Sequence, residues 1–530
     1  MLRLRLVRSF TSKAGRISAT PATRVFRNEL KPSELTKSPL DEAAIKVSDA
    51  EPSLLQHLKD RGLVANVTED SLEELLQKNF TSFYLGIDPS GPSMHLGHMV
   101  PVMVMLHLFL RGHFAFALVG GATGAVGDPT GKNSERVALE KSALQSNLDS
   151  LASSLERTFL HAVSAAKKEG VYYGDQVKLQ YAIVNNHDWW KNVGFLEFLA
   201  SYGRLIRVNQ MMARDSVKGR LDTAAGLGYN EFSYQILQAF DFWHLFETQG
   251  CALQLGGGDQ WGNITAGVDL AKRAAAVNDI KRTPYGVTTQ LMLHKNGMKL
   301  GKSEGNTHIW LNPEMTRPFE LYQHLLQIED TEVEQYLKMF TFVSLEEIAA
   351  IMKRHGEDTQ RRHAQLVLAE KFTALIHGDT AVERCKIITR IMFLKSQLEL
   401  NQQDKPAALT DPELLKQILT EEGLLTNHEG SPDYVTILST HFDMSKAAAK
   451  RMISGGGVSV GLEDKLDKLK ITGGEVQKEH LEFDQFVIVR VGKKIRCLYL
   501  GEDQLPKSKS VVGISDSYEV HTEDIDVTRK

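Results

Sequence analysis

Cysteine is scarce in this sequence, with only Cys251, Cys385 and Cys497 among 530 residues. Three cysteines set far apart support neither a disulfide framework nor a cysteine-rich zinc module, and they favour a reducing compartment. The most apolar run, residues 99–110, includes a histidine and falls well short of the ~20 residues that a transmembrane helix needs. Because the net charge is only −4, any nucleic-acid surface must be a local basic patch. We therefore predict a chain without membrane or structural-metal association.

The length of the chain exceeds what one hydrophobic core can organise. At roughly 150 residues per domain, 530 residues predict about three domains. With 42% apolar and 24% charged residues, the composition is that of an ordinary soluble globular protein.

The N-terminal segment has no acidic side chain before Glu29. Residues 1–28 combine an apolar start with serine, threonine and seven basic residues, which is typical of a mitochondrial transit peptide. We predict such a peptide here and a location in the mitochondrial matrix. The alternative is a basic tail that binds RNA or has no partner.

From about residue 81, apolar strands, glycine-rich turns and helices alternate. This order predicts an α/β fold with a doubly wound, Rossmann-like parallel sheet and a ligand at the carboxyl ends of its strands. Beyond about residue 315 the pattern becomes helical. After a polar stretch with two prolines near residues 400–412, a smaller region with helices and strands follows.

The glycine-rich loop "VGGATGAVGDPTGKNSER" does not match known phosphate motifs. A P-loop would need glycine at Val126 and serine or threonine at Asn133, and the dinucleotide pattern of three glycines is also missing. Asp128, at the end of this turn, is a candidate to hold an ammonium group or a metal-bound water. Its alternative role is to cap the turn before Pro129.

Residues 229–246 predict a helix with a single polar stripe, because Tyr234, Gln238 and Asp241 stand at positions i, i+4 and i+7. The other faces are apolar, so a buried helix would direct this stripe into a cavity. A phenol, an amide and a carboxylate can together hold an amino acid's ammonium and one polar side-chain group. A solvent-facing stripe is the competing interpretation.

Two short motifs suggest phosphate chemistry. "HLGH" places His95 and His98 on one face at the start of a helix, where backbone N–H groups and the helix dipole attract anions. "KLGKS" places Lys299 and Lys302 where they can neutralise a leaving pyrophosphate. Taken singly, the histidines could be packed core residues and the lysines a solvated turn. A metal site is weakly supported because no third ligand is nearby.

Together these motifs resemble those of class I aminoacyl-tRNA synthetases, whose marks are His-Ile-Gly-His and Lys-Met-Ser-Lys-Ser. "YLGIDPSGPSMHLGH", "EFSYQILQAFDF" and "LQLGGGDQWGNITAG" are closely similar to the tyrosyl-tRNA synthetases of the bacterial and organellar type. The resemblance covers most of residues 50–500. Leu96, Leu300 and Gly301 depart from the family motifs, whereas the histidine and lysine spacings are kept.

The resemblance implies activation of L-tyrosine with ATP and Mg²⁺, followed by transfer to tRNA(Tyr), in a homodimer. It implies these roles: catalysis by His95, His98, Lys299, Lys302 and Ser303 with Lys132 and Arg136; tyrosine binding by Tyr84, Asp128, Tyr234, Gln238, Asp241 and Gln260; and ATP binding by Asp88, Gly97, Asp259 and Lys302. The expected organisation is a transit peptide (1–28), a helical extension (29–80), a catalytic nucleotide-binding domain (81–314), a helical domain for the anticodon arm (315–400), a linker (401–430), a small RNA-binding domain (431–505) and a disordered tail (506–530).

The small domain resembles an RNA-binding domain shared with a ribosomal protein. Its candidate phosphate contacts lie on a helix and on a hairpin: Lys446, Lys450, Arg451, Lys493, Lys494 and Arg496. A solvated helix and a charged turn are the alternative.

Two other functions remain open at the level of sequence. The tryptophanyl enzymes share the fold and the reaction, but Tyr84 and Asp241 favour a phenol over an indole. An RNA-binding or splicing factor derived from a synthetase is the second alternative. The histidine and lysine motifs argue against a protein that has lost catalysis.

Overall fold

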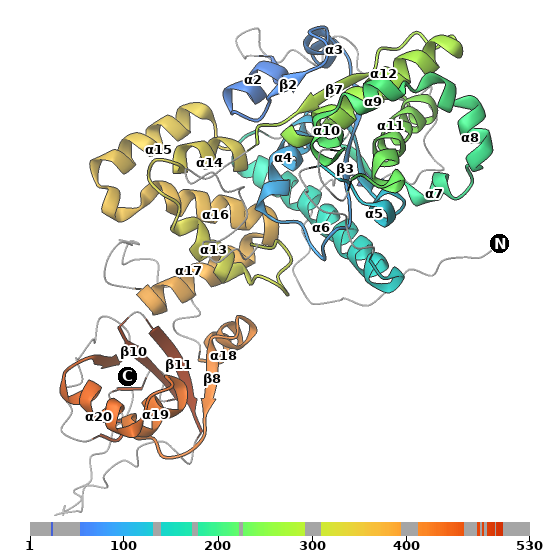
Figure 1. Ribbon diagram of the computed structural model, residues 1–530. Coiled ribbons are helices and arrows are strands. Elements are labelled where there is room, and N and C mark those ends of the chain that lie inside the picture. The colour runs from blue at the N-terminus through green and yellow to red at the C-terminus, as the bar shows by residue number, and fades with distance from the viewer. Residues whose placement is uncertain are drawn as a thin grey trace, which may run out of the picture. The chain divides into compact units, whose positions relative to one another are not determined.

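The computed structural model describes residues 23–24, 53–130, 139–171, 179–221, 226–291, 309–393, 412–460, 474–477, 480–481, 485–492 and 494–501. The chain forms two compact units, Met1–Lys386 and Ile387–Lys530. The helical region predicted as a separate domain belongs to the first unit up to Lys386. Figure 1 labels the elements of both units.

A seven-stranded sheet organises the first unit, with strand order β1-β5-β4-β3-β6-β7-β2. Its five inner strands are all parallel. The strands are β1 (Thr23–Arg24), β2 (Asn66–Val67), β3 (Ser82–Ile87), β4 (Phe114–Val119), β5 (Gln180–Asn185), β6 (Cys251–Gly256) and β7 (Tyr285–Thr288). The predicted doubly wound sheet is confirmed.

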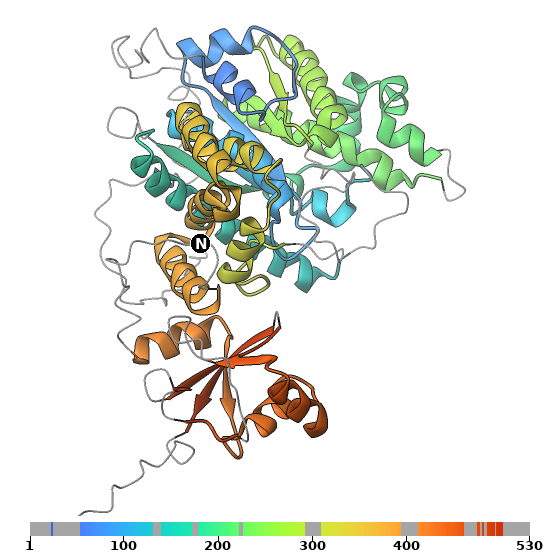
Figure 2. The same cartoon turned by 90° about the vertical axis from the view of Figure 1, so that its left-hand side faces the viewer.

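Helices lie on both sides of this sheet, as Figure 2 shows. The chain winds from β3 to β4 to β5, then returns to place β6 on the other side of β3. Because parallel crossovers are right-handed, this reversal puts α4 and α6 on one face and α11 and α12 on the other, in agreement with the contacts within each pair. The helices before residue 280 are α2 (Leu54–Asp60), α3 (Leu72–Lys78), α4 (Met99–Leu110), α5 (Thr123–Val126), α6 (Lys141–Lys168), α7 (His187–Trp190), α8 (Phe195–Ser201), α9 (Val208–Met212), α10 (Asp215–Leu221), α11 (Tyr229–Gln249) and α12 (Trp261–Val277).

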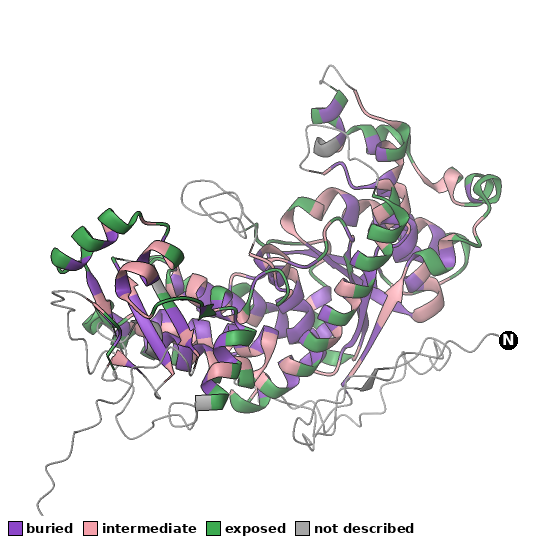
Figure 3. Cartoon of the chain, turned by 90° about the horizontal axis from the view of Figure 1, so that it is seen from below, coloured by how far each residue is buried: buried purple, intermediate pink, exposed green. Residues whose placement is uncertain are grey.

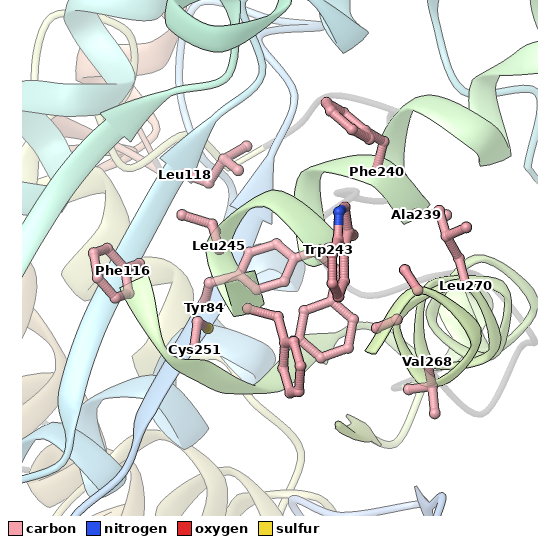
Figure 4. Close-up of a cluster of buried hydrophobic side chains, with 14 of the residues drawn as sticks. Tyr84, Phe116, Leu118, Ala239, Phe240, Trp243, Leu245, Cys251, Val268 and Leu270 are labelled. Carbon is pink, nitrogen blue, oxygen red and sulfur yellow. The ribbon is translucent and has the colours of Figure 1, made fainter. Parts of the chain in front are cut away.

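The apolar pattern of the sequence accounts for the core. Strands β4, β6 and β7 are buried at every residue, as expected for a parallel sheet covered on both faces (Figure 3). Helix α11 is apolar on most sides and ends at Gly250, whose φ of +68° suits glycine at a helix C-terminus. Figure 4 shows side chains of α11, among them Trp243 and Leu245, around Tyr84 of β3.

Five helices follow the α/β region: α13 (Pro318–Leu326), α14 (Val333–Phe340), α15 (Leu345–Glu357), α16 (His363–His377) and α17 (Asp379–Phe393). Arg61, directly after α2, ties the N-terminal extension to them. Its guanidinium is only 2% exposed and donates to the carbonyls of Lys338, Thr341 and Val343. These carbonyls lie at and just beyond the end of α14, where a carbonyl has no N–H donor within the helix.

Two boundaries predicted for the N-terminal region need correction. Thr23 and Arg24 pair in parallel with Gln180 and Tyr181 of β5, although residues 1–28 were expected to lie outside the fold. The outer side of β5 offers free backbone groups to which even a two-residue strand can pair. The extension over 29–80 is also not purely helical, because β2 pairs antiparallel with β7.

The second unit holds a four-stranded sheet of order β8-β11-β10-β9. Its elements are α18 (Pro412–Glu421), β8 (Leu425–His428), α19 (Tyr434–His441), α20 (Lys446–Ser454), β9 (Val458–Val460), β10 (Phe486–Val491) and β11 (Lys494–Leu500). The linker predicted over 401–430 is therefore wrong from residue 412 onward. Pro412 begins a helix whose Leu415, Ile418 and Leu419 are buried, and apolar burial at helical spacing outweighs a polar average composition. The tail predicted over 506–530 lies outside the described residues.

Candidate active site

A cavity of about 590 Å³ opens at the carboxyl ends of β3 and β6, where the winding direction of the sheet reverses. In doubly wound sheets this switch point is the usual ligand site. The cavity brings together, from segments far apart in sequence, the predicted residues Tyr84, Asp88, His95, Gly97, His98, Asp128, Tyr234, Gln238, Asp241, Asp259 and Gln260. The other predicted residues of the catalytic site, Lys132, Arg136, Lys299, Lys302 and Ser303, lie outside the described residues.

The two histidines hold each other in place at the entrance to α4. His98 Nδ1 accepts a hydrogen bond from the backbone N–H of His95 at 3.1 Å, and His95 Nδ1 accepts one from the N–H of Gly97 at 3.1 Å. Their ring centroids are 3.9 Å apart. Because each Nδ1 acts as an acceptor, the proton of each neutral ring is on Nε2. The pair is therefore arranged to offer N–H donors.

The segment that follows the lysine motif returns to the histidine motif. Trp310 forms an antiparallel bridge with His95, and their ring centroids lie 6.2 Å apart. Next to this bridge, the N–H of Leu311 donates to the carbonyl of Met94 at 2.9 Å, and one residue further the N–H of Asn312 donates to Ser93 Oγ at 3.0 Å. Residues about 215 positions apart are thus joined at the edge of the cavity.

A chain of hydrogen bonds connects two carboxylates of the cavity, Asp88 and Asp241. Tyr234 donates from its hydroxyl to Asp88 Oδ2 at 2.6 Å, and Thr123 Oγ1 donates to Asp88 Oδ1 at 2.7 Å. Asn186 Nδ2 donates at 2.9 Å both to Thr123 Oγ1 and to Asp241 Oδ2. The network fixes both carboxylates relative to each other before any ligand binds.

Asp128 takes the turn-capping role considered from the sequence and also lines the cavity. Its Oδ1 accepts the N–H of Thr130 at 2.9 Å, which is the turn-capping role. Its Oδ2 accepts a hydrogen bond from Gln260 Nε2 at 2.8 Å inside the cavity. One side chain therefore shapes the loop and places a carboxylate oxygen in the cavity.

Tyr84 and Asp241, each only 2% exposed, form a deeply buried polar end of the cavity. The Tyr84 hydroxyl has no hydrogen-bond partner among the described residues. Burial, reinforced by the charge of Asp241, raises the pKa of Tyr84 well above its ordinary value. Burial also raises the pKa of Asp241 to about 7, against the lowering effect of three N–H donors. A hydroxyl placed here could accept from the phenol and donate to the carboxylate.

The sequence interpretation missed four polar residues of this network: Thr123, Asn186, Trp189 and Trp190. Asn186 is fully buried, and both indoles donate to Asp241 Oδ1 at 2.8 Å. The stretch "NNHDWW" matches no motif, so its only signal was position, since it directly follows strand β5 at the ligand-bearing edge of the sheet.

In the second unit, Lys446, Lys450 and Arg451 are exposed on α20, and Arg496 is exposed on β11. The Arg496 guanidinium lies 5.9 Å from the ring centroid of Phe442. Lys493 and the side chain of Lys494 lie outside the described residues. The helix thus presents three cations on its exposed side.

Within the part of the chain that the structure describes, no helix is long and apolar enough to cross a membrane. No group of three or more histidine, cysteine, aspartate or glutamate side chains there could hold a metal ion.

Comparison with known proteins identifies the family that the chain matches. Residues 76–393 match the family described as tRNA synthetases class I (W and Y). The mitochondrial tyrosine–tRNA ligase of Saccharomyces cerevisiae is 35% identical over 451 residues, which cover 84% of this chain and 88% of that protein. The tyrosine–tRNA ligase of Lactiplantibacillus plantarum is 36% identical over 450 residues, covering 83% of this chain and 98% of that protein.

Solved structures agree with these matches. A C-terminally truncated mitochondrial tyrosyl-tRNA synthetase from Aspergillus nidulans superimposes with a TM-score of 0.60 at 35% identity, covering 66% of this chain and 97% of that one. The corresponding structure from Coccidioides posadasii gives a TM-score of 0.57 at 32% identity, covering 65% of this chain and 94% of that one.

Proposed function

This chain belongs to the class I tRNA synthetases for tryptophan and tyrosine, and from that premise we propose how its residues perform the tyrosine–tRNA ligase reaction. In that reaction the carboxylate of L-tyrosine attacks the α-phosphorus of ATP, pyrophosphate leaves, and the tyrosyl group passes from the adenylate to the 3′ end of tRNA(Tyr). No covalent intermediate with the enzyme is needed. The protein contributes positioning and charge stabilisation.

The tyrosine substrate occupies the end of the cavity lined by α11. Its phenolic hydroxyl lies between Tyr84 and Asp241, and its ammonium group lies near Asp128, Tyr234 and Gln260, with Gln238 on the same helix face. The phenolic end then meets the Asp241 carboxylate, held by Asn186, and the ammonium end meets the Asp128 carboxylate, held by Gln260 and the N–H of Thr130. Preformed acceptors cost no reorganisation on binding.

ATP occupies the end of the cavity near α4. Gly97, Asp88 and Asp259 contact the nucleotide, and the Nε2–H groups of His95 and His98 donate to the α-phosphate as it becomes pentacoordinate. Lys299, Lys302 and Ser303 neutralise the departing pyrophosphate, assisted by Lys132 and Arg136. Mg²⁺ enters bound to ATP as part of the substrate and would offset phosphate charge.

The observation that carries this assignment is the buried hydroxyl of Tyr84, to which no side chain or backbone group of the described residues forms a hydrogen bond, beside the carboxylate of Asp241. The test is exchange of labelled pyrophosphate into ATP in the presence of each amino acid in turn. Only tyrosine should support exchange. Exchange with tryptophan alone would assign the sister activity, and the absence of any tyrosine-dependent exchange would refute the proposal.

We propose that the protein acts as a homodimer. Half of the large apolar side chains exposed in the described residues fall between residues 195 and 229: Phe195, Leu196, Leu199, Val208, Met212, Leu221 and Tyr229. Leu196 is 79% exposed and Tyr229 is 68% exposed. Exposed apolar groups at this density are typical of a surface that a partner covers.

Sedimentation of the full chain tests the dimer. Leu196→Asp together with Tyr229→Asp should lower the mass to that of the monomer, whereas Leu160→Asp, at a 46% exposed leucine on α6, should not. A dimer that survives the double substitution would place the interface elsewhere.

The second unit is proposed to bind the tRNA backbone through Lys446, Lys450 and Arg451 on α20, with Lys493, Lys494 and Arg496 on the hairpin. Each lost phosphate contact should weaken tRNA binding and reduce its dependence on salt concentration. The helical region α13–α17 is proposed to support the anticodon arm. Neutralising the two lysines and the arginine of α20 should raise the KM for tRNA while leaving pyrophosphate exchange unchanged.

The protein is mitochondrial by likeness to its yeast relative, and the matrix, where translation occurs, is the proposed compartment. The segment before β1 is proposed as the targeting segment, because Thr23 and Arg24 pair with β5. A fluorescent protein fused after residue 50 should enter mitochondria, and the same fusion with the five basic residues before Thr23 changed to glutamine should stay outside.

A further inference from the structure

Asp241 is surrounded by an unusual number of N–H donors for a single buried carboxylate. Trp189 Nε1 and Trp190 Nε1 both donate to Oδ1 at 2.8 Å, and Asn186 Nδ2 donates to Oδ2 at 2.9 Å. All three donors come from the short segment that follows β5. The carboxylate itself belongs to α11 and lines the cavity.

The count of acceptor sites limits where a substrate can bind. An ionised carboxylate offers about four lone-pair sites, two on each oxygen. The two indoles occupy both sites of Asp241 Oδ1, and the amide of Asn186 occupies one site of Oδ2. One acceptor site is left, and it is on Oδ2. A substrate hydroxyl must therefore donate to that oxygen.

The two tryptophans are packed differently. Trp189 is buried and its ring stacks on His244, with centroids 4.7 Å apart and an angle of 20°. Trp190 is half-buried, with its ring 4.7 Å from Phe240 and 5.5 Å from Phe198. Phenylalanine at position 190 would keep much of this aromatic packing and remove only the N–H donor.

We propose that Trp190 is a positioning residue for amino-acid selection, whose indole N–H fills Asp241 Oδ1 and thereby keeps the carboxylate ionised with Oδ2 turned to the substrate hydroxyl. The proposal rests on the proposed role of Asp241 in binding tyrosine. A site built to bond a substrate hydroxyl rejects the analogue that lacks it, and tyrosyl enzymes are the established example. Trp190 would act in that selection without touching the substrate.

Because of the charges around Asp241, the hydrogen bond from Trp190 affects the protonation of this carboxylate near neutral pH. Burial and the nearby charge of Asp88 raise the pKa of Asp241 and the N–H donors lower it, which leaves this pKa at about 7. The other titratable groups facing this cluster are the phenols of Tyr84 and Tyr234 and the imidazole of His244. Loss of one donor should raise the pKa of Asp241, so that the neutral acid, a weaker acceptor, predominates at pH 7.

The test compares Trp190→Phe with the wild type in tyrosine- and phenylalanine-dependent pyrophosphate exchange between pH 5.5 and 9. A hydrogen bond to a charged group corresponds to about a tenfold effect, so the preference for tyrosine should fall about tenfold at pH 7. It should recover by pH 9, with the acid limb of kcat/KM for tyrosine moved up by about one pH unit. Trp243→Phe is the matched control, because this indole on α11 has no hydrogen-bond partner among the described residues.

If Trp190→Phe lowered the preference for tyrosine by the same factor at every pH, or did not lower it at all, the proposal would be overturned. Trp190 would then be a packing residue. If the wild type itself showed no tyrosine-dependent exchange, the proposed function would fail instead. A second measurement needs no variant that might misfold. With five tryptophans in the chain, the indole signals of ¹⁵N-tryptophan-labelled protein can be separated, and that of Trp190 should titrate near pH 7. An indole signal for Trp190 that is constant from pH 5.5 to 9 would also refute the proposal.

Discussion

The hydroxyl of Tyr234 and the carboxylate of Asp88 are joined by a 2.6 Å hydrogen bond that links α11 to the end of β3. Tyr234→Phe leaves Asp88 Oδ2 without this donor inside the cavity. A hydrogen bond to a charged group contributes about 1.5–3 kcal/mol, so kcat/KM for tyrosine should fall about 10- to 100-fold in pyrophosphate exchange. Tyr229→Phe, at an exposed position of the same helix, should change it less than twofold.

His95→Ala removes an Nε2–H donor from the proposed α-phosphate site. Adenylate formation should slow about 10²- to 10³-fold, the usual effect of losing one donor to a developing charge, while the Kd for tyrosine stays nearly constant. Single-turnover kinetics and equilibrium dialysis separate the two quantities. His187→Ala, at an exposed histidine, is the control. A lost affinity for tyrosine would mean that His95 packs the site rather than acting on ATP.

Gly120 leaves room for the Asp88 carboxylate. A Cβ at this position would lie 2.0 Å from Asp88 Oδ1 and 2.4 Å from Thr123 Oγ1, so Gly120→Ala must displace the network. Exchange activity should fall at least about tenfold with the protein still folded. Gly219→Ala, where a Cβ would meet nothing within 4 Å, should be neutral. Equal activity of the two variants would show that the network tolerates a shift of Asp88.

The titration of Asp241 should appear in stability. Its pKa rises from an ordinary 3.8 to about 7 on folding, so between these values the folded protein holds a proton that the unfolded chain has released. Stability contributed by this group is therefore lost as pH rises from about 4 to 7, by about 4 kcal/mol in total. Urea midpoints of the wild type should decline relative to Asp241→Asn over that range and run parallel above it. If the urea midpoints of the two proteins ran parallel over the whole pH range, the raised pKa of Asp241 would be contradicted.

Arg61 should contribute strongly to the stability of the first unit. Arg61→Met leaves the carbonyls of Lys338, Thr341 and Val343 without their donor in a buried position. The expected loss in the free energy of unfolding is about 3 kcal/mol, measured by urea denaturation. Lys59→Met, at an exposed lysine in the last turn of α2, should cost less than about 0.5 kcal/mol. A similar loss for both variants would show that the carbonyls find other donors.

The sequence predicted the sheet and most of the cavity for different reasons. Strands such as β4 are continuous apolar runs, and burial on both faces requires this pattern. His95, Tyr234 and Asp241 were identifiable because helical spacing puts polar groups on one face, and the family resemblance added their roles.

The remainder of the site depends on contacts that no local pattern encodes. Asn186, Trp189 and Trp190 act through hydrogen bonds to Asp241, more than 50 residues away, and two adjacent tryptophans look like core residues in the sequence. The linker was misplaced for a related reason. A polar average over 401–430 concealed the buried stripe of Leu415, Ile418 and Leu419, which only the small sheet explains.

The bridge between His95 and Trp310 has a consequence for biosynthesis. A growing chain that has not yet emerged beyond Trp310 cannot complete the backbone pairing beside His95. The edge of the cavity at the histidine motif is therefore finished late in synthesis, only after more than half of the chain has been made.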